Sequence, residues 1–311
     1  MLSRRSVRVK VMQLLYMLNR DEDLQFPDMV KAYNDGIWKA FELYIFQLYV
    51  ILKVTQQAEN DAATRAAKHL PTEEDKAFQP VLYTNPLVKS LANHTGFLNL
   101  VEKYKTGPEL DGDLLRRLYY GFTETPEYKA WMDVPEKTDN DHAKMLLEMY
   151  KYLSGHDIFI ELCEERYTNT ADDESLVAGA IKKTLKALPA SGEFYQEHTP
   201  SDETVREFGE ELLRKTCQED TALFAEINPM LQNWDAERVA ILDMIMLKMA
   251  LCELLHFPTI PTKVTLNEFV EISKNYSTDK SKDFINGILD RLMKQLQQTG
   301  RIVKEGRGLV E

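Results

Sequence analysis

Hydrophobic residues recur every three or four positions over most of this chain, which is the spacing of amphipathic α-helices. The first predicted helix covers residues 3–18, and Ser3 stands where a helix N-cap is expected. One face of that helix carries four apolar residues: Val7, Val11, Leu14 and Leu18. No segment combines strict alternation of apolar and polar residues with hairpin turns. The pattern therefore predicts an all-α protein.

The same spacing predicts further helices before and after the segment 189–201. A long helix is predicted over residues 28–68, and its aromatic-rich middle indicates a packing helix rather than a ligand site. The other predicted helices lie at 86–103, 111–124, 140–153, 156–167, 174–188, 202–220, before 231, after Trp234, at 265–276 and at 277–298. The segment 189–201 contains two prolines and a glycine, so we predict a domain boundary there.

Two local signals refine the C-terminal helices. Thr265 and Glu268 have the spacing of a capping box, which predicts a helix start at Thr265. Gly287 interrupts the last helix, and a glycine there is expected to let another helix approach closely.

Charge is distributed unevenly along the chain. The first twenty residues carry five positive charges and no negative one, whereas the whole chain of 311 residues has a net charge of −12. On a helical wheel Arg4, Arg5 and Arg8 lie within one arc, while Lys10 points elsewhere. An acidic protein with a local group of arginines is expected to bind a polyanion through that group alone.

The sequence shows no pattern typical of an enzyme, a cofactor site or a metal site. It lacks the glycine-rich phosphate motifs, and its six histidines and three cysteines have no ligand spacing. Its most apolar run, residues 43–52, is too short to span a bilayer. We therefore expect a cytoplasmic, non-enzymatic protein without cofactor, metal or membrane contact.

Two distant segments resemble the NusB family of bacterial transcription antitermination factors. The N-terminal segment SRRSVRVKVMQLLYML resembles the arginine-rich opening helix of that family. The C-terminal resemblance runs through Asn233-Trp234, Arg238, MALCELL (249–255), IPTKVTLNEFVEISKNY (260–276) and DFINGILDRL (283–292). These blocks have the order of the family and cover about residues 1–20 and 200–296.

The resemblance implies a NusB-like helical bundle with additional inserted helices. Residues 1–20 would form the basic N-terminal helix of the bundle, and residues 202–298 its C-terminal helical core. Residues 21–188 would be a helical insertion, and residues 299–311 a flexible tail. Some RNA cytosine methyltransferases carry a NusB-like domain followed by their catalytic domain, and the short segment after residue 292 leads us to expect no such enzyme.

The resemblance also implies a function and a binding site. The protein would bind a boxA-like single-stranded element of nascent ribosomal RNA, together with NusE, a ribosomal protein, and the RNA polymerase elongation complex. The expected RNA-binding residues are Arg4, Arg5, Arg8, Lys280, Lys282 and Phe284. Phe284 would stack on an unpaired base, and the lysines flank a helix N-terminus suited to phosphate. The alternative is a helical protein-interaction module without RNA binding, which Asp279 and Asp283 beside the lysines favour because they repel phosphate.

Overall fold

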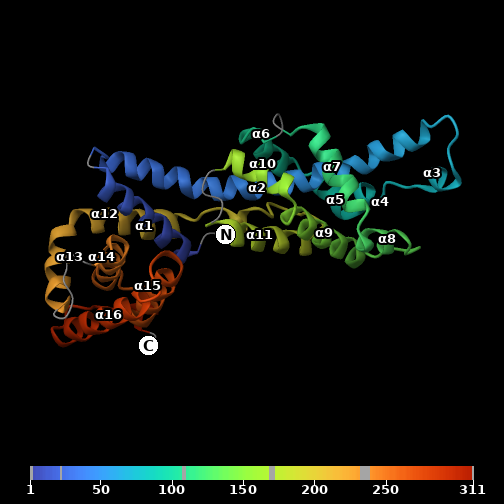
Figure 1. Ribbon diagram of the computed structural model, residues 1–311. Coiled ribbons are helices and arrows are strands. Elements are labelled where there is room, and N and C mark those ends of the chain that lie inside the picture. Colours follow the sequence, from blue (N-terminus) through green and yellow to red (C-terminus); the bar gives the residue numbers. More distant parts are fainter. Residues whose placement is uncertain (1–2, 22, 107–109, 168–171, 232–238, 310–311) are drawn as a thin grey trace. The chain divides into compact units, whose positions relative to one another are not determined.

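The all-α prediction is confirmed by a computed structural model of the chain (Figure 1). The structure describes residues 3–21, 23–106, 110–167, 172–231 and 239–309, and within these ranges it contains helices and no strand. The chain forms two compact units. Unit 1 is Trp38–Thr199, and unit 2 combines Leu2–Ile37 with Pro200–Glu311.

Unit 2 is built from both ends of the chain and the first turns of the long helix α2 (Phe26–Ala66). Its other elements are α1 (Arg4–Arg20), the π-helical segment η2 (Glu203–Glu210), α12 (Glu211–Gln218), α13 (Asp220–Ile227), η3 (Asn228–Leu231), α14 (Ile241–His256), α15 (Thr262–Tyr276), α16 (Ser281–Gln298) and η5 (Gly306–Leu309).

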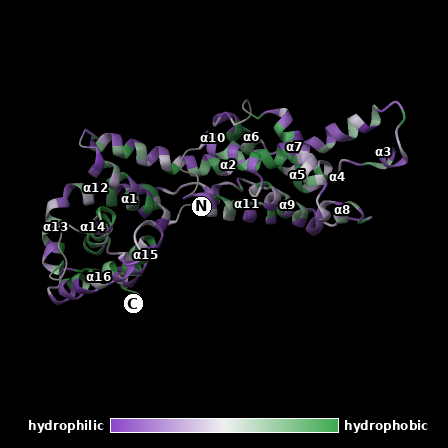
Figure 2. Cartoon of the chain, viewed as in Figure 1, coloured by the Kyte–Doolittle hydropathy of each residue, from purple (hydrophilic) through white to green (hydrophobic). Residues whose placement is uncertain are grey.

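Helix α14 is the centre of unit 2. It is apolar on all sides, as its colouring in Figure 2 shows, and its residues from Ile245 to Leu254 are buried apart from Lys248. A helix that is hydrophobic around its whole circumference requires partners on every side. Helices α1, α12, α13, α15 and α16 provide them. This arrangement brings the first helix of the chain against helices more than 200 residues away.

Unit 1 is a separate helical core around the rest of α2. Its helices are α3 (Glu73–Ala77), α4 (Val81–Thr84), α5 (Pro86–Ala92), α6 (Thr95–Lys103), α7 (Gly112–Thr123), α8 (Pro126–Met132), α9 (Asp139–Ser154), α10 (Asp157–Arg166), α11 (Glu174–Lys186) and η1 (Gln196–His198). Polar side chains on α2 are paired inside this core. The hydroxyl groups of Tyr44 and Thr184 lie 2.8 Å apart, and Tyr150 donates a hydrogen bond to Gln47.

Several predicted boundaries shift in the structure. The helix predicted over 86–103 is two helices, because His94 caps a new start with its ring nitrogen. Helix α8 was not predicted at all. The chain passes from unit 1 to unit 2 between Thr199 and Pro200, inside the segment 189–201, but residues 23–37 belong to unit 2 and not with the inserted helices.

Two local predictions are wrong. Helix α15 begins at Thr262, so Thr265 is not an N-cap; it is buried inside the helix and donates a hydrogen bond to Glu253. Gly287 does not allow a close helix approach, because a Cβ atom there would meet nothing within 4 Å. Gly209 in η2 is at a close approach in unit 2, where a Cβ would come within 1.9 Å of the Tyr33 hydroxyl.

The C-terminal segment, predicted to be a flexible tail, makes specific contacts within unit 2. The backbone N–H of Glu305 donates a hydrogen bond to the carbonyl of Pro258. Lys304 donates hydrogen bonds to the carbonyls of Leu254 and Phe257, the last groups of α14 and its cap. The segment therefore covers the C-terminal end of the central helix.

Candidate nucleic-acid interface

The N-terminal arginines lie in unit 2, on a helix that is mostly core. Ser3 caps α1 as predicted, accepting a hydrogen bond from the backbone N–H of Ser6. Residues 7–9, 11–12 and 14–15 are buried, so α1 is covered on nearly all sides through its middle. Its two ends are more exposed than its middle, where Lys10 and Gln13 are partly exposed.

Each of the three arginines faces a carboxylate from another element of unit 2. Arg4 bonds to Glu203 of η2 at 3.0 Å. Arg5 binds Glu268 of α15 through Nε and Nη2, both at 2.7 Å. Arg8 binds Glu253 of α14 in the same two-point manner, also at 2.7 Å.

Arg8 is a structural residue and leaves the candidate interface. Its side chain is 2% exposed and that of Glu253 is fully buried. The guanidinium lies 4.9 Å from the ring centre of Phe208 and 5.8 Å from that of Phe269. A side chain enclosed in this way cannot reach RNA unless the core opens, so the sequence-based expectation for Arg8 is corrected.

Arg5 and Arg4 remain accessible. The side chain of Arg5 is 50% exposed, while Glu268 is 19% exposed. The hydrogen bond from Arg5 lowers the pKa of Glu268, and the same bond raises the pKa of Arg5. Both groups are therefore held in their charged forms, and the ion pair is present at neutral pH.

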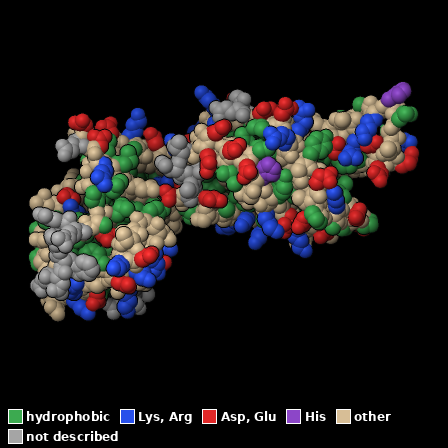
Figure 3. Space-filling model, in the orientation of Figure 1, with side chains coloured by type: hydrophobic (Ala, Val, Ile, Leu, Met, Phe, Trp, Pro, Cys, Tyr) green, Lys and Arg blue, Asp and Glu red, His purple; other side chains and the backbone are tan. Residues whose placement is uncertain are grey.

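The pairing changes the electrostatic picture of the N-terminus. Arg4, Arg5 and Arg8 are each matched by one glutamate, so the excess positive charge of the sequence is neutralised locally. On the visible face of the molecule, basic and acidic side chains are interspersed (Figure 3). A ligand with phosphate groups meets an arrangement of paired charges here and not a continuous basic patch.

The second predicted group lies at the start of α16. Asp243 of α14 accepts hydrogen bonds from the hydroxyls of Ser277 and Ser281 at 2.6 and 2.7 Å, and so fixes this helix start against the core. Lys280 and Lys282 are exposed on either side of Ser281.

Beside this helix start is a pocket of about 240 Å³. Partly buried Phe284 lines it together with Thr278 and Lys280. Asp243 and Ser281 line it as well. The aromatic ring and the lysine suit an unpaired base and its phosphate, whereas the carboxylate of Asp243 opposes a phosphate.

The two groups lie at opposite ends of α14. Arg8 contacts that helix at Glu253, and the start of α16 contacts it at Asp243. Ten residues at 1.5 Å each separate these contacts by about 15 Å along the axis. The N-terminal arginines and Lys280 therefore do not form one compact site, and only an extended ligand reaches both.

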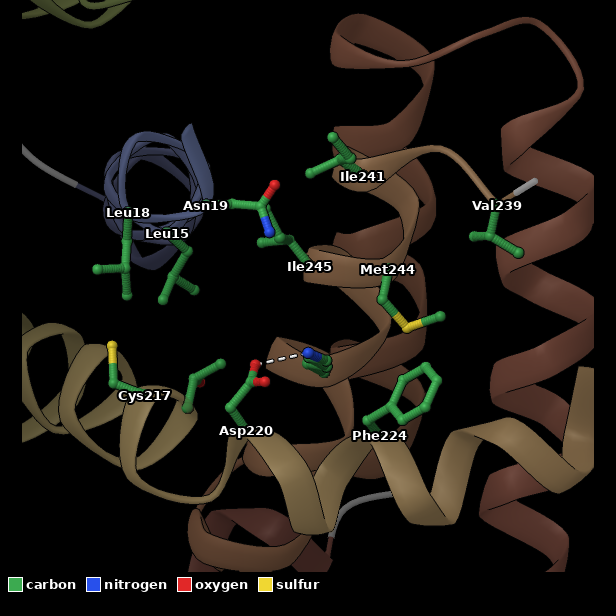
Figure 4. A pocket seen from close by; sticks show the side chains of 12 residues that line it. Leu15, Leu18, Asn19, Cys217, Asp220, Phe224, Val239, Ile241, Met244 and Ile245 are labelled. Atoms are coloured by element: carbon green, nitrogen blue, oxygen red, sulfur yellow. Dashed lines mark hydrogen bonds and ion pairs between the residues drawn. The ribbon is translucent and has the colours of Figure 1, made fainter. Parts of the chain in front are cut away.

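A further pocket of about 390 Å³ lies against the C-terminal end of α1 (Figure 4). Leu15, Leu18 and Asn19 of α1 face it, and at its base Lys248 forms an ion pair with Asp220 at 2.6 Å. The described residues contain no cluster suited to a metal ion. None of the described helices is long and apolar enough to cross a bilayer.

Comparison with known proteins supports the family resemblance. The model of the NusB family matches residues 167–294. The transcription antitermination protein NusB of Salinibacter ruber is 39% identical over 109 residues, which are 35% of this chain and 68% of that protein. The chain belongs to the NusB family. The proteins of the same name from Chloroherpeton thalassium and Methylacidiphilum infernorum are each 36% identical, over 64% and 70% of their own lengths. No solved structure matches the chain.

The matched residues include the lysines and Phe284 but not α1. Helix α1 joins the NusB part of the chain through its packing on α12, α14 and α15. Much of unit 1 precedes residue 167, so this NusB-family protein carries an extra N-terminal region. Sequence reasoning missed the glutamates that face the arginines, although one signal was present: Glu253 is a lone charge in the apolar run MALCELL, and such a residue is rarely buried without a partner.

Proposed function

We propose that the protein is an RNA-binding transcription antitermination factor that acts on boxA-like elements of nascent ribosomal RNA, together with the ribosomal protein NusE and the RNA polymerase elongation complex. Family membership supports this role, since three relatives carry the name transcription antitermination protein. The proposed work is binding and assembly, without a bond made or broken.

The proposed RNA contacts are Arg4 and Arg5 at one end of unit 2, and Lys280, Lys282 and Phe284 at the other. The observation that carries this proposal is the pocket at Phe284, which Thr278 and Lys280 also line. Because the contacts that anchor the two groups are about 15 Å apart along α14, the RNA would run along unit 2 in an extended, single-stranded form.

A second function, a protein-interaction module without RNA binding, is favoured by the ion pairs of the arginines. Each accessible arginine already has a carboxylate partner, and Asp279 and Asp283 are exposed beside the lysines. These acids weaken phosphate binding at both ends, so the two functions require a direct test.

The test is the affinity for a boxA-like RNA and for a scrambled RNA across salt concentrations, with and without NusE. Four phosphate contacts predict a log–log salt slope of about −3, at about −0.7 per contact for a single strand. Changing Lys280 and Lys282 to alanine should reduce the slope by about 1.4.

Phe284→Ala should weaken binding of the boxA-like RNA by about 1–3 kcal/mol with little change in slope, because stacking is not an ionic contact. The matched control is Lys294→Ala on the same helix, whose lysine pairs with Asp290 and lies outside the proposed contacts. Equal weak binding of both RNAs, unaffected by all of these changes, would support the protein-interaction function instead.

A further inference from the structure

The contact between Arg5 and Glu268 has a geometry that bears directly on RNA binding. Arg5 uses Nε and Nη2, the two-donor edge of its guanidinium, to hold both carboxylate oxygens of Glu268. This edge can also bind a phosphate group through two parallel hydrogen bonds, as can the Nη1/Nη2 edge. A phosphate that binds the Nε/Nη2 edge competes with Glu268 for the same donors.

Glu268 has a second cation within reach. Its Oε2 lies 3.7 Å from Nη1 of Arg8, the guanidinium nitrogen that Arg8 does not use for Glu253. Arg8 is buried and cannot follow RNA. If Arg5 releases Glu268, the guanidinium of Arg8 still lies beside the Glu268 carboxylate. The partly buried carboxylate therefore keeps a positively charged partner.

We propose that Glu268 is an affinity-setting residue: RNA binds Arg5 by exchange, in which a phosphate displaces Glu268 from Arg5 and Glu268 transfers to Arg8. This inference rests on the proposed RNA-binding function. Arg4 and Glu203 form a one-point pair at 3.0 Å, and Glu203 is more exposed than Glu268, so this pair is more easily broken. Without RNA, the accessible arginines are therefore paired with glutamates. Breaking these ion pairs costs binding free energy, and only a ligand with several closely spaced phosphates makes enough new contacts to offset that loss.

The experiment measures binding of a boxA-like RNA by the full chain at fixed low salt. Glu268→Gln keeps the shape of the side chain and removes its charge, so it should tighten RNA binding about two- to fivefold, the worth of a partly exposed ion pair. The matched control is Glu271→Gln on the same helix, which removes a charge close enough to act on Arg5 but pairs with Lys274 instead. That change should tighten binding less than Glu268→Gln.

A double variant isolates the exchange. In an Arg5→Ala background the effect of Glu268→Gln should fall to that of Glu271→Gln, because no arginine remains to be released. Weaker binding by Glu268→Gln would mean that Glu268 holds Arg5 in place for RNA, and would overturn the proposal. An unchanged affinity, or a gain that remains larger than that of Glu271→Gln in the Arg5→Ala background, would overturn it as well.

The outcomes also separate this inference from the function on which it rests. Absence of RNA binding by the wild type and by every variant would overturn the proposed function, and the exchange with it. RNA binding that responds to Lys280 and Phe284 but not to Glu268 would leave the function standing and overturn the exchange alone.

Discussion

Replacing Arg8 by methionine should destabilise unit 2 strongly. The change removes the partner of Glu253, which is fully buried and retains a single neutral donor, the Thr265 hydroxyl at 2.7 Å. Breaking a buried ion pair by removing one partner costs about 3–5 kcal/mol, because the remaining charge has lost its water as well. We expect Arg8→Met to lie in that range.

The double change Arg8→Met with Glu253→Met should recover most of the loss. Both charges are then absent, and methionine packs well against aromatic rings such as those of Phe208 and Phe269 beside the Arg8 guanidinium. Substitution of a whole buried pair by apolar residues is often neutral or stabilising, by about 1–4 kcal/mol. Such a recovery would show that Arg8→Met destabilises unit 2 through the unpaired charge of Glu253 and not through the lost volume of the Arg8 side chain.

The assay is hydrogen exchange of the native protein, followed peptide by peptide during a urea series. Peptides from α14 report unit 2, and peptides from α9 in unit 1 are the internal control, since a chain of two units need not unfold in one step. A single variant within about 1 kcal/mol of the wild type would refute the reasoning. A double variant no more stable than the single one would refute it too, because the charge of Glu253 would not be the cause.

Three further predictions follow from individual residues. Gly209→Ala should destabilise unit 2 in urea unfolding, because its Cβ would lie 1.9 Å from the Tyr33 hydroxyl and 2.3 Å from a methyl group of Val7. Gly287→Ala should instead stabilise unit 2 by about 1 kcal/mol, because a Cβ there meets no atom within 4 Å and alanine favours the helix. Asp243→Ala should cost about 1–3 kcal/mol and speed hydrogen exchange in the first turn of α16, because two hydroxyls lose their acceptor. Burial lowers the pKa of His198 below its ordinary 6.5, so the unfolded state takes up the proton first and unit 1 should lose stability as the pH falls below about 6.5. His198→Gln should reduce that loss in urea titrations at several pH values.

The helices of this protein were largely predictable from its sequence, because apolar spacing reports which face of a helix is buried and needs no knowledge of the partner. Helix α1 illustrates the limit of such reasoning. Its spacing gave one apolar face, yet Val9 and Arg8, outside that face, are buried as well. A charged side chain is rarely buried without a partner, and the partner of Arg8 is 245 residues away in the chain.

The same limit applies to the second binding group. The sequence showed two lysines and a phenylalanine near a helix start, and the structure places them there. It did not show that Asp243 fixes this start, or that the start lies at the other end of α14 from the arginines. Both facts depend on how α14 crosses its neighbours, and local spacing carries no information about that crossing.

The arginines of the first turn of α1 show how one physical argument changes when the partners are known. Positive charges at a helix N-terminus oppose the helix dipole, at about 0.3–1 kcal/mol each, and from sequence alone only a bound phosphate offered compensation. The glutamates of η2, α14 and α15 now supply it within the protein. The helix dipole is therefore no longer a reason to expect RNA binding. The proposal that RNA binds at the N-terminal end of α1 depends instead on which arginine side chains are exposed. By that criterion Arg8 fixes α1 to the core, whereas Arg5, half exposed and paired with Glu268 through Nε and Nη2, remains a proposed RNA contact.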